Sequence, residues 1–261
     1  MSSRPAWLCA LAVIASFSAG CGGAAESSDA AQPADFSAVE GARDLAQATE
    51  LGEHALLPDM DIAPPPDLAS PPSIVSSPIP YAATRLSEMA TYSLHHYGVA
   101  TSVLVPQLIV LHFTDTSTWT SAFNLFSADT SNRGELPGTC SHYIVEQDGT
   151  IHALVGEDVR CRHAVGMNHV ALGIEMVESS QGKGGAFGDG EILARPAQID
   201  AVLHLVKWLQ LKYGIATDHV IGHAMANASP LFLDLEGWTN DHVDWLEPDV
   251  IELRKRLDAL P

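Results

Sequence analysis

Apolar residues recur at helical spacing in four segments of the chain. In the first, the apolar side chains run from Leu86 to Tyr97 and the pattern stops at Gly98, a residue type that favours helix ends. In the third, Pro196 stands at an early helical position, where its missing N–H costs no hydrogen bond. The pattern predicts helices over residues 86–97, 118–127, 196–214 and from Pro248 onward, in a domain that begins near Pro80.

Short apolar runs between these segments indicate strands. Residues 108–111 form an apolar, partly β-branched run that ends at His112-Phe113-Thr114, as expected of a buried central strand. Asp148-Gly149 separates two strand-like runs, 141–146 and 150–155, and Asp-Gly is a strong signal for a β-hairpin. Further strands are expected over residues 170–177 and 219–223. Strands mixed with helices predict an α/β fold with a mixed central sheet flanked by helices.

The first 79 residues differ from the rest in composition. Arg4 and an apolar run from Ala6 to Phe17 precede Ala19-Gly20-Cys21, which resembles a bacterial lipoprotein signal, although Ser18 replaces the usual Leu. The run is too short to remain as a membrane-spanning helix. We therefore predict a signal peptide over residues 1–20 and lipidation of Cys21. The alternative is an ordinary cleaved signal with an incidental cysteine.

Residues 22–79 are rich in Ala, Asp, Glu and Pro and have little apolar periodicity, which predicts a disordered tether. The chain then divides into a signal peptide (1–20), a lipidated cysteine with an acidic Pro/Ala-rich linker (21–79) and a folded domain (80–261). The lipid would hold the protein on a membrane of the bacterial cell envelope. By the same resemblance, Gly22 after Cys21 favours the outer membrane, facing the periplasm.

The charge of the chain argues against one class of partner, and its cysteines bear on the compartment in which it folds. The chain has 13 Lys and Arg against 32 Asp and Glu, a formal net charge of −19, so nucleic-acid partners are not expected. After removal of Cys9 and modification of Cys21, Cys140 and Cys161 remain, and export to an oxidising compartment favours a disulfide between them. Two buried free thiols are the alternative.

Side chains that can bind a metal follow two of the predicted strands and occupy a loop near the end of the chain. His112 ends the run 108–111, His223 ends the run 219–223, and Asp244 precedes the last helix. Ligands in an open α/β sheet lie at strand ends. Catalytic zinc takes three protein ligands and leaves a fourth position for water, so two His and one carboxylate satisfy it.

Five segments in order resemble the zinc-dependent N-acetylmuramoyl-L-alanine amidases of the type-2 amidase and peptidoglycan-recognition-protein family. They are Ile-Val-Leu-His-Phe-Thr (109–114), Ser-His-Tyr-Ile-Val with Asp-Gly-Thr-Ile (141–145, 148–151), Arg-His-Ala-Val-Gly (162–166), Leu-Gly-Ile-Glu (172–175) and Val-Ile-Gly-His (220–223). The resemblance spans residues 107–257. It implies one Zn²⁺ per domain and peptidoglycan or a muropeptide as the partner.

The resemblance assigns the zinc ligands position by position. The first two fall on His112 and His223. The family usually carries its third ligand about ten residues after the second His, in a Lys-Xaa-Asp-Pro segment, which this chain lacks. His-Val-Asp-Trp at 242–245 resembles the ending of a longer loop found in some members, so Asp244 is the expected ligand, with Asp234 and Asp241 as rivals.

The catalytic residues follow in the same way. The family's acidic residue falls on Glu175, a candidate general acid and base. Its cationic residue, commonly Lys, falls on His242, whose imidazole, protonated or as the donor tautomer, would stabilise the oxyanion of a tetrahedral intermediate. His163 and, with less support from the pattern, His142 are candidates for substrate contact in the cleft, while packing or capping is the alternative for His142.

For several other residues the sequence favours a structural role over a catalytic or binding one. Residues 182–190 are Gly-rich without the Lys-Ser/Thr ending of a phosphate-binding loop, which predicts a flexible loop beside the cleft. Trp238 and Trp245 suit core packing better than stacking on a sugar. The helical histidines are expected to be solvated or at the edge of the core: His95, His96 and His204.

The sequence thus predicts a monomeric zinc amidase that cleaves the bond between N-acetylmuramic acid and L-alanine. A rival of another class is a non-catalytic peptidoglycan-binding module on the same fold, which the altered third-ligand region keeps open. A further alternative is an amidohydrolase that acts on soluble muropeptides or other acyl amides.

Overall fold

The computed structural model describes residues 67–261, all within the unit Ile62–Pro261. The predicted signal peptide (1–20), Cys21 and the linker as far as residue 66 lie outside the described residues. None of the helices in the described part has both the length and the apolar character that a membrane crossing requires.

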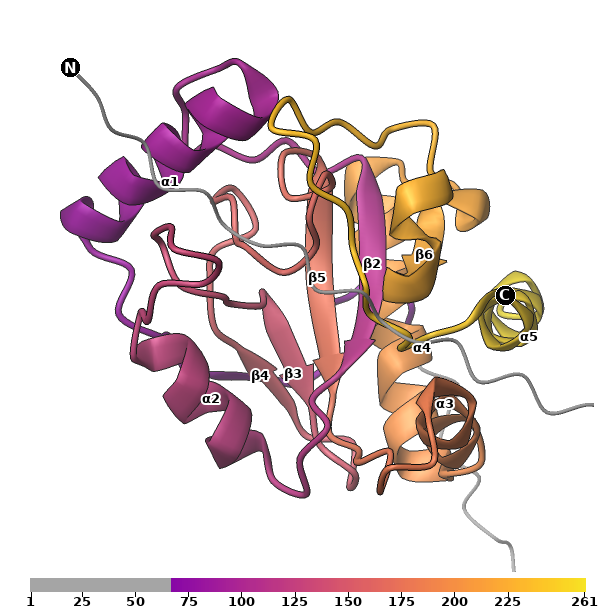
Figure 1. Ribbon diagram of the computed structural model, residues 1–261. Coiled ribbons are helices and arrows are strands. Elements are labelled where there is room, and N and C mark those ends of the chain that lie inside the picture. The colour runs from indigo at the N-terminus through magenta and orange to yellow at the C-terminus, as the bar shows by residue number, and fades with distance from the viewer. Residues whose placement is uncertain (1–66) are drawn as a thin grey trace, which may run out of the picture. The chain divides into compact units, whose positions relative to one another are not determined.

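A mixed sheet of six strands forms the centre, as the sequence predicts (Figure 1). The two long strands, β2 (Leu108–Phe113) and β5 (Ala171–Met176), pair in parallel, and their side chains are almost all buried. Burial on both faces explains why they read as continuous apolar runs. The strand order is β1-β4-β3-β5-β2-β6, completed by β1 (Ile74–Ser76), β3 (Tyr143–Val145), β4 (Ile151–Ala153) and β6 (Val220–Gly222).

The β3–β4 pair is the antiparallel hairpin expected from Asp148-Gly149. Gly149 has a φ of 89°, a conformation that glycine adopts readily, and the Glu146 N–H donates to the Thr150 carbonyl at 2.8 Å. All other pairs among the described strands are parallel. The carboxyl ends of β2, β5 and β6 consequently meet at one edge of the sheet.

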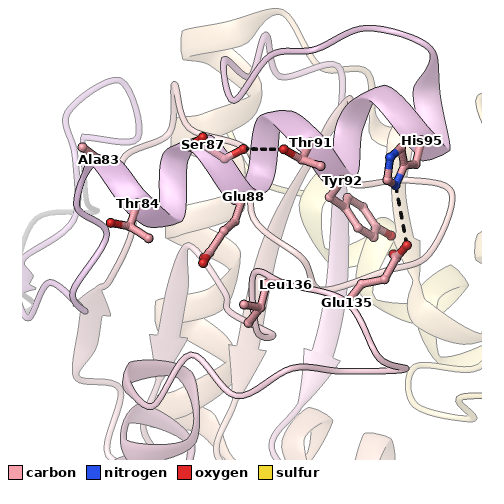
Figure 2. Close-up of a pocket in the computed structure, with 9 residues that line it drawn as sticks. All are labelled: Ala83, Thr84, Ser87, Glu88, Thr91, Tyr92, His95, Glu135 and Leu136. Atoms are coloured by element: carbon pink, nitrogen blue, oxygen red, sulfur yellow. Dashed lines mark hydrogen bonds and ion pairs between the residues drawn. The ribbon is translucent and has the colours of Figure 1, made fainter.

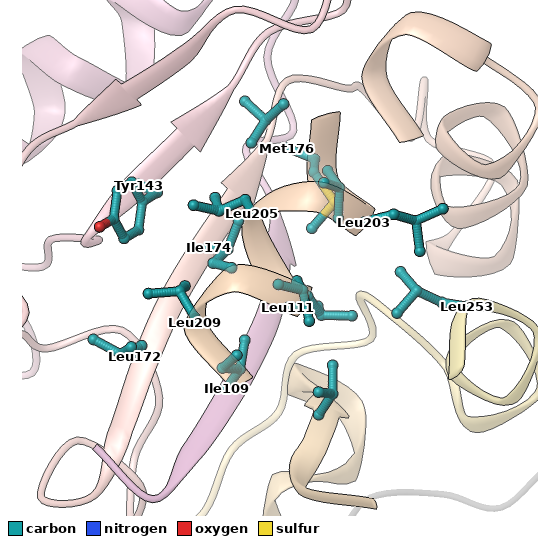
Figure 3. Packing of buried hydrophobic residues seen from close by; sticks show 14 of the residues in the cluster. Ile109, Leu111, Tyr143, Leu172, Ile174, Met176, Leu203, Leu205, Leu209 and Leu253 are labelled. Carbon is teal, nitrogen blue, oxygen red and sulfur yellow. The ribbon is translucent and has the colours of Figure 1, made fainter. Parts of the chain in front are cut away.

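Helices cover both faces of the sheet (Figure 1). Ile109 and Leu111 of β2 belong to the main apolar cluster together with side chains of α4 and α5 (Figure 3). Ile144 of β3 points the other way and packs with α2. The helices are α1 (Ala83–Tyr97), α2 (Trp119–Ser127), α3 (Gly185–Leu193), α4 (Pro196–Tyr213) and α5 (Glu247–Asp258), with 3₁₀ turns η1 (Thr217–His219) and η2 (His223–Ala228).

The folded domain begins earlier than the expected start near residue 80. β1 pairs with β4 in parallel, Ile74 opposite Ile151, and Ser77 Oγ lies 3.0 Å from His152 Nδ1. Ile79 is buried in the cluster on the α2 side. A strand of three residues between prolines is too short to show a periodicity, so the sequence pattern does not reveal it.

The predicted flexible loop at residues 182–190 is wrong from Gly185 onward, because α3 begins there. A Cβ on Gly185 would lie 1.7 Å from the Val243 carbonyl oxygen, and one on Gly188 would lie 2.9 Å from the Phe113 ring. The glycines therefore allow close packing of α3 against two neighbouring segments. Tertiary contacts override the low helix propensity of glycine here.

Candidate metal centre

The centre forms where three strands of the sheet end. His112 lies near the end of β2, directly opposite Glu175 of β5, and His223 follows the last residue of β6. Asp244 comes from the segment before α5. Parallel pairing thus brings together residues that are more than a hundred positions apart in the sequence.

Two imidazole nitrogens and a carboxylate converge on one point. His112 Nδ1 lies 3.0 Å from His223 Nδ1 and 3.4 Å from Asp244 Oδ2, and His223 Nδ1 lies 3.2 Å from Asp244 Oδ1. All three side chains are buried, and their ligand atoms lie within 4.8 Å of one another. Two nitrogens and one oxygen are the donor set of catalytic zinc sites, so these residues fit Zn²⁺.

The surroundings of His112 leave its Nδ1 free to act as a ligand. Its Nε2 lies 3.0 Å from His163 Nδ1, and His163 Nε2 donates to the Ala171 carbonyl at 3.2 Å. Burial, and then the neighbouring His223, lowers the pKa of His112 to about 4. A neutral imidazole is the form that binds metal.

Main-chain contacts fix the segment that carries Asp244. The buried Asp189 carboxylate of α3 accepts hydrogen bonds from the N–H groups of Trp245 and Leu246, both at 2.9 Å. The Ala224 N–H donates to the Asp244 carbonyl at 3.0 Å. Burial opposes ionisation of Asp244, but the two imidazoles hold the pKa of its carboxyl well below the ordinary value. Asp244 is therefore an anion, as a ligand must be.

The two rival carboxylates lie elsewhere. Asp234 Oδ2 is 2.8 Å from His96 Nδ1, in a contact buried on both sides. Asp241 is mostly exposed and lies 3.4 Å from a guanidinium nitrogen of Arg133. The structure thus brings Asp244, and neither rival, to His112 and His223.

Glu175 lies beside this centre, and its carboxyl group makes few polar contacts. It is 9% exposed, and its Oε2 has no hydrogen-bond partner in the part of the chain that the structure describes. Burial, and then the negative charge of Asp244, raises the pKa of Glu175 to about 8. A carboxyl group in this range can both hold and release a proton near neutral pH.

The cleft above the centre has a volume of about 540 Å³ and contains His112, His223, Asp244, Glu175 and His242 in its wall. Apolar side chains of α2 face it, and no Lys or Arg of the described residues lines it. His242 stacks on His223 with ring centroids 4.3 Å apart, and its side chain is 61% exposed. Partial burial of the ring, and then His223, lowers the pKa of His242, which favours the neutral donor tautomer over the protonated form.

The chain matches the family model described as N-acetylmuramoyl-L-alanine amidase over residues 102–241, more than half of its length. It belongs to this amidase family. No curated protein matches the chain.

Three solved structures are among those similar to this chain. An endolysin N-acetylmuramoyl-L-alanine amidase from Clostridium intestinale is 21% identical, with 74% of this chain and 99% of that chain covered and a TM-score of 0.46. The amidase AmiD from E. coli, solved with an anhydro-N-acetylmuramic acid peptide, is 23% identical, with 46% and 48% covered and a TM-score of 0.35. The bumblebee protein PGRP-SA is 20% identical, with 49% and 77% covered and a TM-score of 0.38.

In this amidase-family chain the predicted role of His142 in substrate contact is wrong. His142 is fully buried, its Nδ1 accepts the Gly173 N–H at 2.9 Å, and its Nε2 donates to the Val159 carbonyl at 3.0 Å. His163 does line the cleft, but its Nδ1 faces His112. A Cβ on Gly173 would lie 2.7 Å from the His163 ring, so this glycine makes room for the ring.

The predicted disulfide between Cys140 and Cys161 is present. It joins the segment before β3 to the segment that carries His163. Trp245 is fully buried, as expected of a core residue, and its indole N–H donates to the His112 carbonyl at 3.3 Å.

A second cavity, of about 610 Å³, runs along α1 and contains none of the predicted ligands (Figure 2). His95 and Glu135 close one end of it, with His95 Nδ1 3.7 Å from Glu135 Oε1. The prediction that the neighbouring His96 is solvated or at the edge of the core is wrong. It is fully buried, with Nδ1 and Nε2 each 2.8 Å from a carboxylate oxygen, of Asp234 and Glu135 respectively.

Asp189 is a residue of the site that the sequence did not indicate. It lies 56 positions before Trp245, inside a glycine-rich run, and no motif links it to the ligands. The signal that could have indicated it is an acidic residue within the apolar and glycine positions of this helix, because a carboxylate that is buried there requires hydrogen-bond donors.

Proposed function

We propose that this protein hydrolyses the amide bond between N-acetylmuramic acid and L-alanine in peptidoglycan or muropeptides, with one Zn²⁺ held by His112, His223 and Asp244. The observation that carries this proposal is the convergence of those three ligands in a cleft that also holds the buried Glu175. Family membership supports the reaction type.

In the proposed reaction the cation and the side chains contribute different chemistry. When bound, Zn²⁺ supplies Lewis-acid chemistry, polarising the scissile carbonyl and making water a stronger acid. Glu175 takes a proton from the attacking water at Oε2 and passes it to the leaving amide nitrogen. A positive charge at the ligands would lower the pKa of Glu175 from about 8 toward neutrality. A carboxyl group with such a pKa can both take up the proton of the water and release it to the leaving nitrogen.

His242 and the cleft wall complete the proposed mechanism. The exposed, neutral ring of His242 donates an N–H to the oxyanion of the tetrahedral intermediate. Stacking on His223 holds this ring over the centre. The apolar face of α2 covers one wall of the cleft and limits the access of bulk water.

The test measures zinc content and hydrolysis together on the purified protein. The expected result is one Zn²⁺ per chain and release of stem peptide from a muropeptide. His112→Ala and Asp244→Ala should lose both, whereas Asp241→Ala and Asp234→Ala should keep the metal. A wild-type protein that neither binds Zn²⁺ nor gains activity from it, yet binds the muropeptide, would be a recognition module instead.

The proposed enzyme is a monomer anchored through lipid on Cys21 to the outer membrane, facing the periplasm. This part rests on the resemblance of residues 4–21 to a lipoprotein signal. Fractionation of expressing bacteria tests it: the wild type should be found with the outer membrane and Cys21→Ser should not. Equal distribution of the two proteins would rule out the lipid anchor.

A further inference from the structure

The hydrogen bonds around Asn240 fix the orientation of its side-chain amide. Asn240 Oδ1 accepts the Val165 N–H at 2.9 Å, and Asn240 Nδ2 donates to the Val165 carbonyl at 2.8 Å. A main-chain N–H can only donate and a main-chain carbonyl can only accept. Rotating the amide by 180° would place donor against donor and acceptor against acceptor, so the orientation is settled by the partners.

This orientation determines which nitrogen of His223 carries a proton. Asn240 Oδ1, an acceptor, lies 3.0 Å from His223 Nε2. The contact is a hydrogen bond only if Nε2 carries the hydrogen, and the neutral ring then has a bare Nδ1. That Nδ1 is the atom that faces His112 and Asp244.

A second asparagine braces the first. Asn227 Oδ1 accepts from Asn240 Nδ2 at 3.1 Å and from the Asn240 N–H at 2.9 Å, and Asn227 Nδ2 donates to the Asn240 carbonyl at 2.9 Å. Both acceptor sites of Oδ1 and both hydrogens of Nδ2 on Asn240 are therefore used. Asn240 is half-buried, whereas Asn227 is exposed, and within the described residues its side chain hydrogen-bonds to Asn240 and not to His223.

We infer that Asn240 is a positioning residue for the metal centre, which holds His223 in the Nε2–H tautomer and aims its bare Nδ1 at the cation. This inference rests on the proposed function, because it takes His223 to be a zinc ligand. Residues that hydrogen-bond the outer nitrogen of a metal-binding histidine fix its tautomer and orientation, and their loss typically weakens metal binding by about 10- to 100-fold. Through Val165, Asn240 also ties the segment after His163 to this ligand.

Zinc affinity of three forms of the full chain, measured by competition with a chelator, tests the inference. Asn240→Ala should bind Zn²⁺ about 10- to 100-fold more weakly than the wild type. Asn227→Ala is the matched control, since it removes the brace and leaves the acceptor for His223; its affinity should stay within about threefold of the wild type. Equal weakening of both variants, or no weakening of Asn240→Ala, would overturn the inference.

Nitrogen-15 NMR of the zinc-loaded proteins supplies a readout that loop damage alone does not move. The wild type and Asn227→Ala should show His223 bound through Nδ1 with a slowly exchanging Nε2–H. Asn240→Ala should exchange that proton at least about tenfold faster. Coordination through Nε2 in the wild type would refute the inference even if Asn240→Ala failed to fold. A wild type that binds no Zn²⁺ would instead refute the proposed function.

Discussion

The pKa values of two buried carboxyl groups in the cleft, Glu175 and Asp244, are shifted in opposite directions. Burial raises the pKa of Glu175 to about 8, with a smaller contribution from Asp244. Asp244 is also buried, but the imidazoles of His112 and His223 keep its pKa low. Environments that separate two carboxyl groups in this way assign different tasks to them. Asp244 stays ionised and can serve as a ligand, while Glu175 can carry a proton.

Glu175→Gln should separate catalysis from metal binding. The amide keeps the shape of the side chain but cannot exchange the proton, so kcat/KM on a muropeptide should fall by about 10²- to 10⁴-fold. Zinc content should remain at one per chain, because Glu175 is outside the ligand trio. Glu191→Gln, at an exposed position of α3, is the control and should be fully active. Activity of Glu175→Gln within about tenfold of the wild type would remove Glu175 from the mechanism.

Residues with a local signature could be predicted from the sequence, and residues that act through distant contacts could not. His112 and His223 each end an apolar strand within a family motif, and the structure brings both to the centre with Asp244. Asn240 and Asp189 act through partners 13 to 75 positions away, which no local pattern encodes. The roles of all five in binding zinc remain predictions.

At the scale of elements, α3 is the part of the site that the sequence pattern described least well. Its glycines suggested a loop, because glycine lowers helix propensity by about 1 kcal/mol relative to Ala. In the fold these glycines let α3 contact the Val243 carbonyl closely, and Asp189 then reaches the main chain of Trp245. The long strands and α4 were predictable, because the continuous apolar runs of the strands and the helical apolar spacing of α4 both reflect burial in one core.

Gly185→Ala and Gly190→Ala form a matched pair that tests the role of α3. A methyl group on Gly185 would meet the Val243 carbonyl at 1.7 Å, so the segment that carries Asp244 has to move. We expect a lower melting temperature and zinc binding weakened by at least about tenfold. Apart from its chain neighbours and its own helix backbone, no described atom lies within 4 Å of a methyl group added to Gly190, and this substitution should stabilise the protein by up to about 1 kcal/mol.

Thermal unfolding of both variants and chelator competition provide the measurements for this pair. If Gly185→Ala binds zinc as tightly as Gly190→Ala, α3 does not position the third ligand. Loss of binding in both variants would mean that the helix responds to any added side chain, irrespective of its contact with Val243.

At the scale of the whole molecule, Glu157 joins the hairpin to the end of α4. Its carboxylate accepts the Tyr143 hydroxyl at 2.5 Å and the Lys212 ammonium at 2.8 Å, and it also accepts the Tyr213 hydroxyl. Burial opposes ionisation of Glu157, but these donors outweigh it and lower the pKa of the carboxyl group. The folded state therefore binds the Glu157 proton more weakly than the unfolded state does.

The direction of this shift predicts how stability depends on pH. A depressed pKa contributes stability that is fully present above the ordinary value of 4.5 and is lost as pH falls through the lower folded-state pKa. Burial, and then Glu157, raises the pKa of Tyr143 and Tyr213, and this contribution is present below pH 10 and lost above it. The cluster should therefore stabilise the fold most between about pH 5 and 10.

Glu157→Gln tests how the stability of the fold depends on pH. At pH 7 its free energy of unfolding should be lower than that of the wild type by about 2 kcal/mol, because hydrogen bonds to a charged acceptor are replaced by neutral ones. The difference should shrink steadily below pH 4.5, as the wild-type carboxylate takes up its proton. Urea unfolding at a series of pH values measures it, with the exposed Glu191→Gln as the control. A constant difference from pH 7 down to about pH 2 would show that the substitution acts through packing, because a lost ion pair must follow the titration of the carboxyl group that formed it.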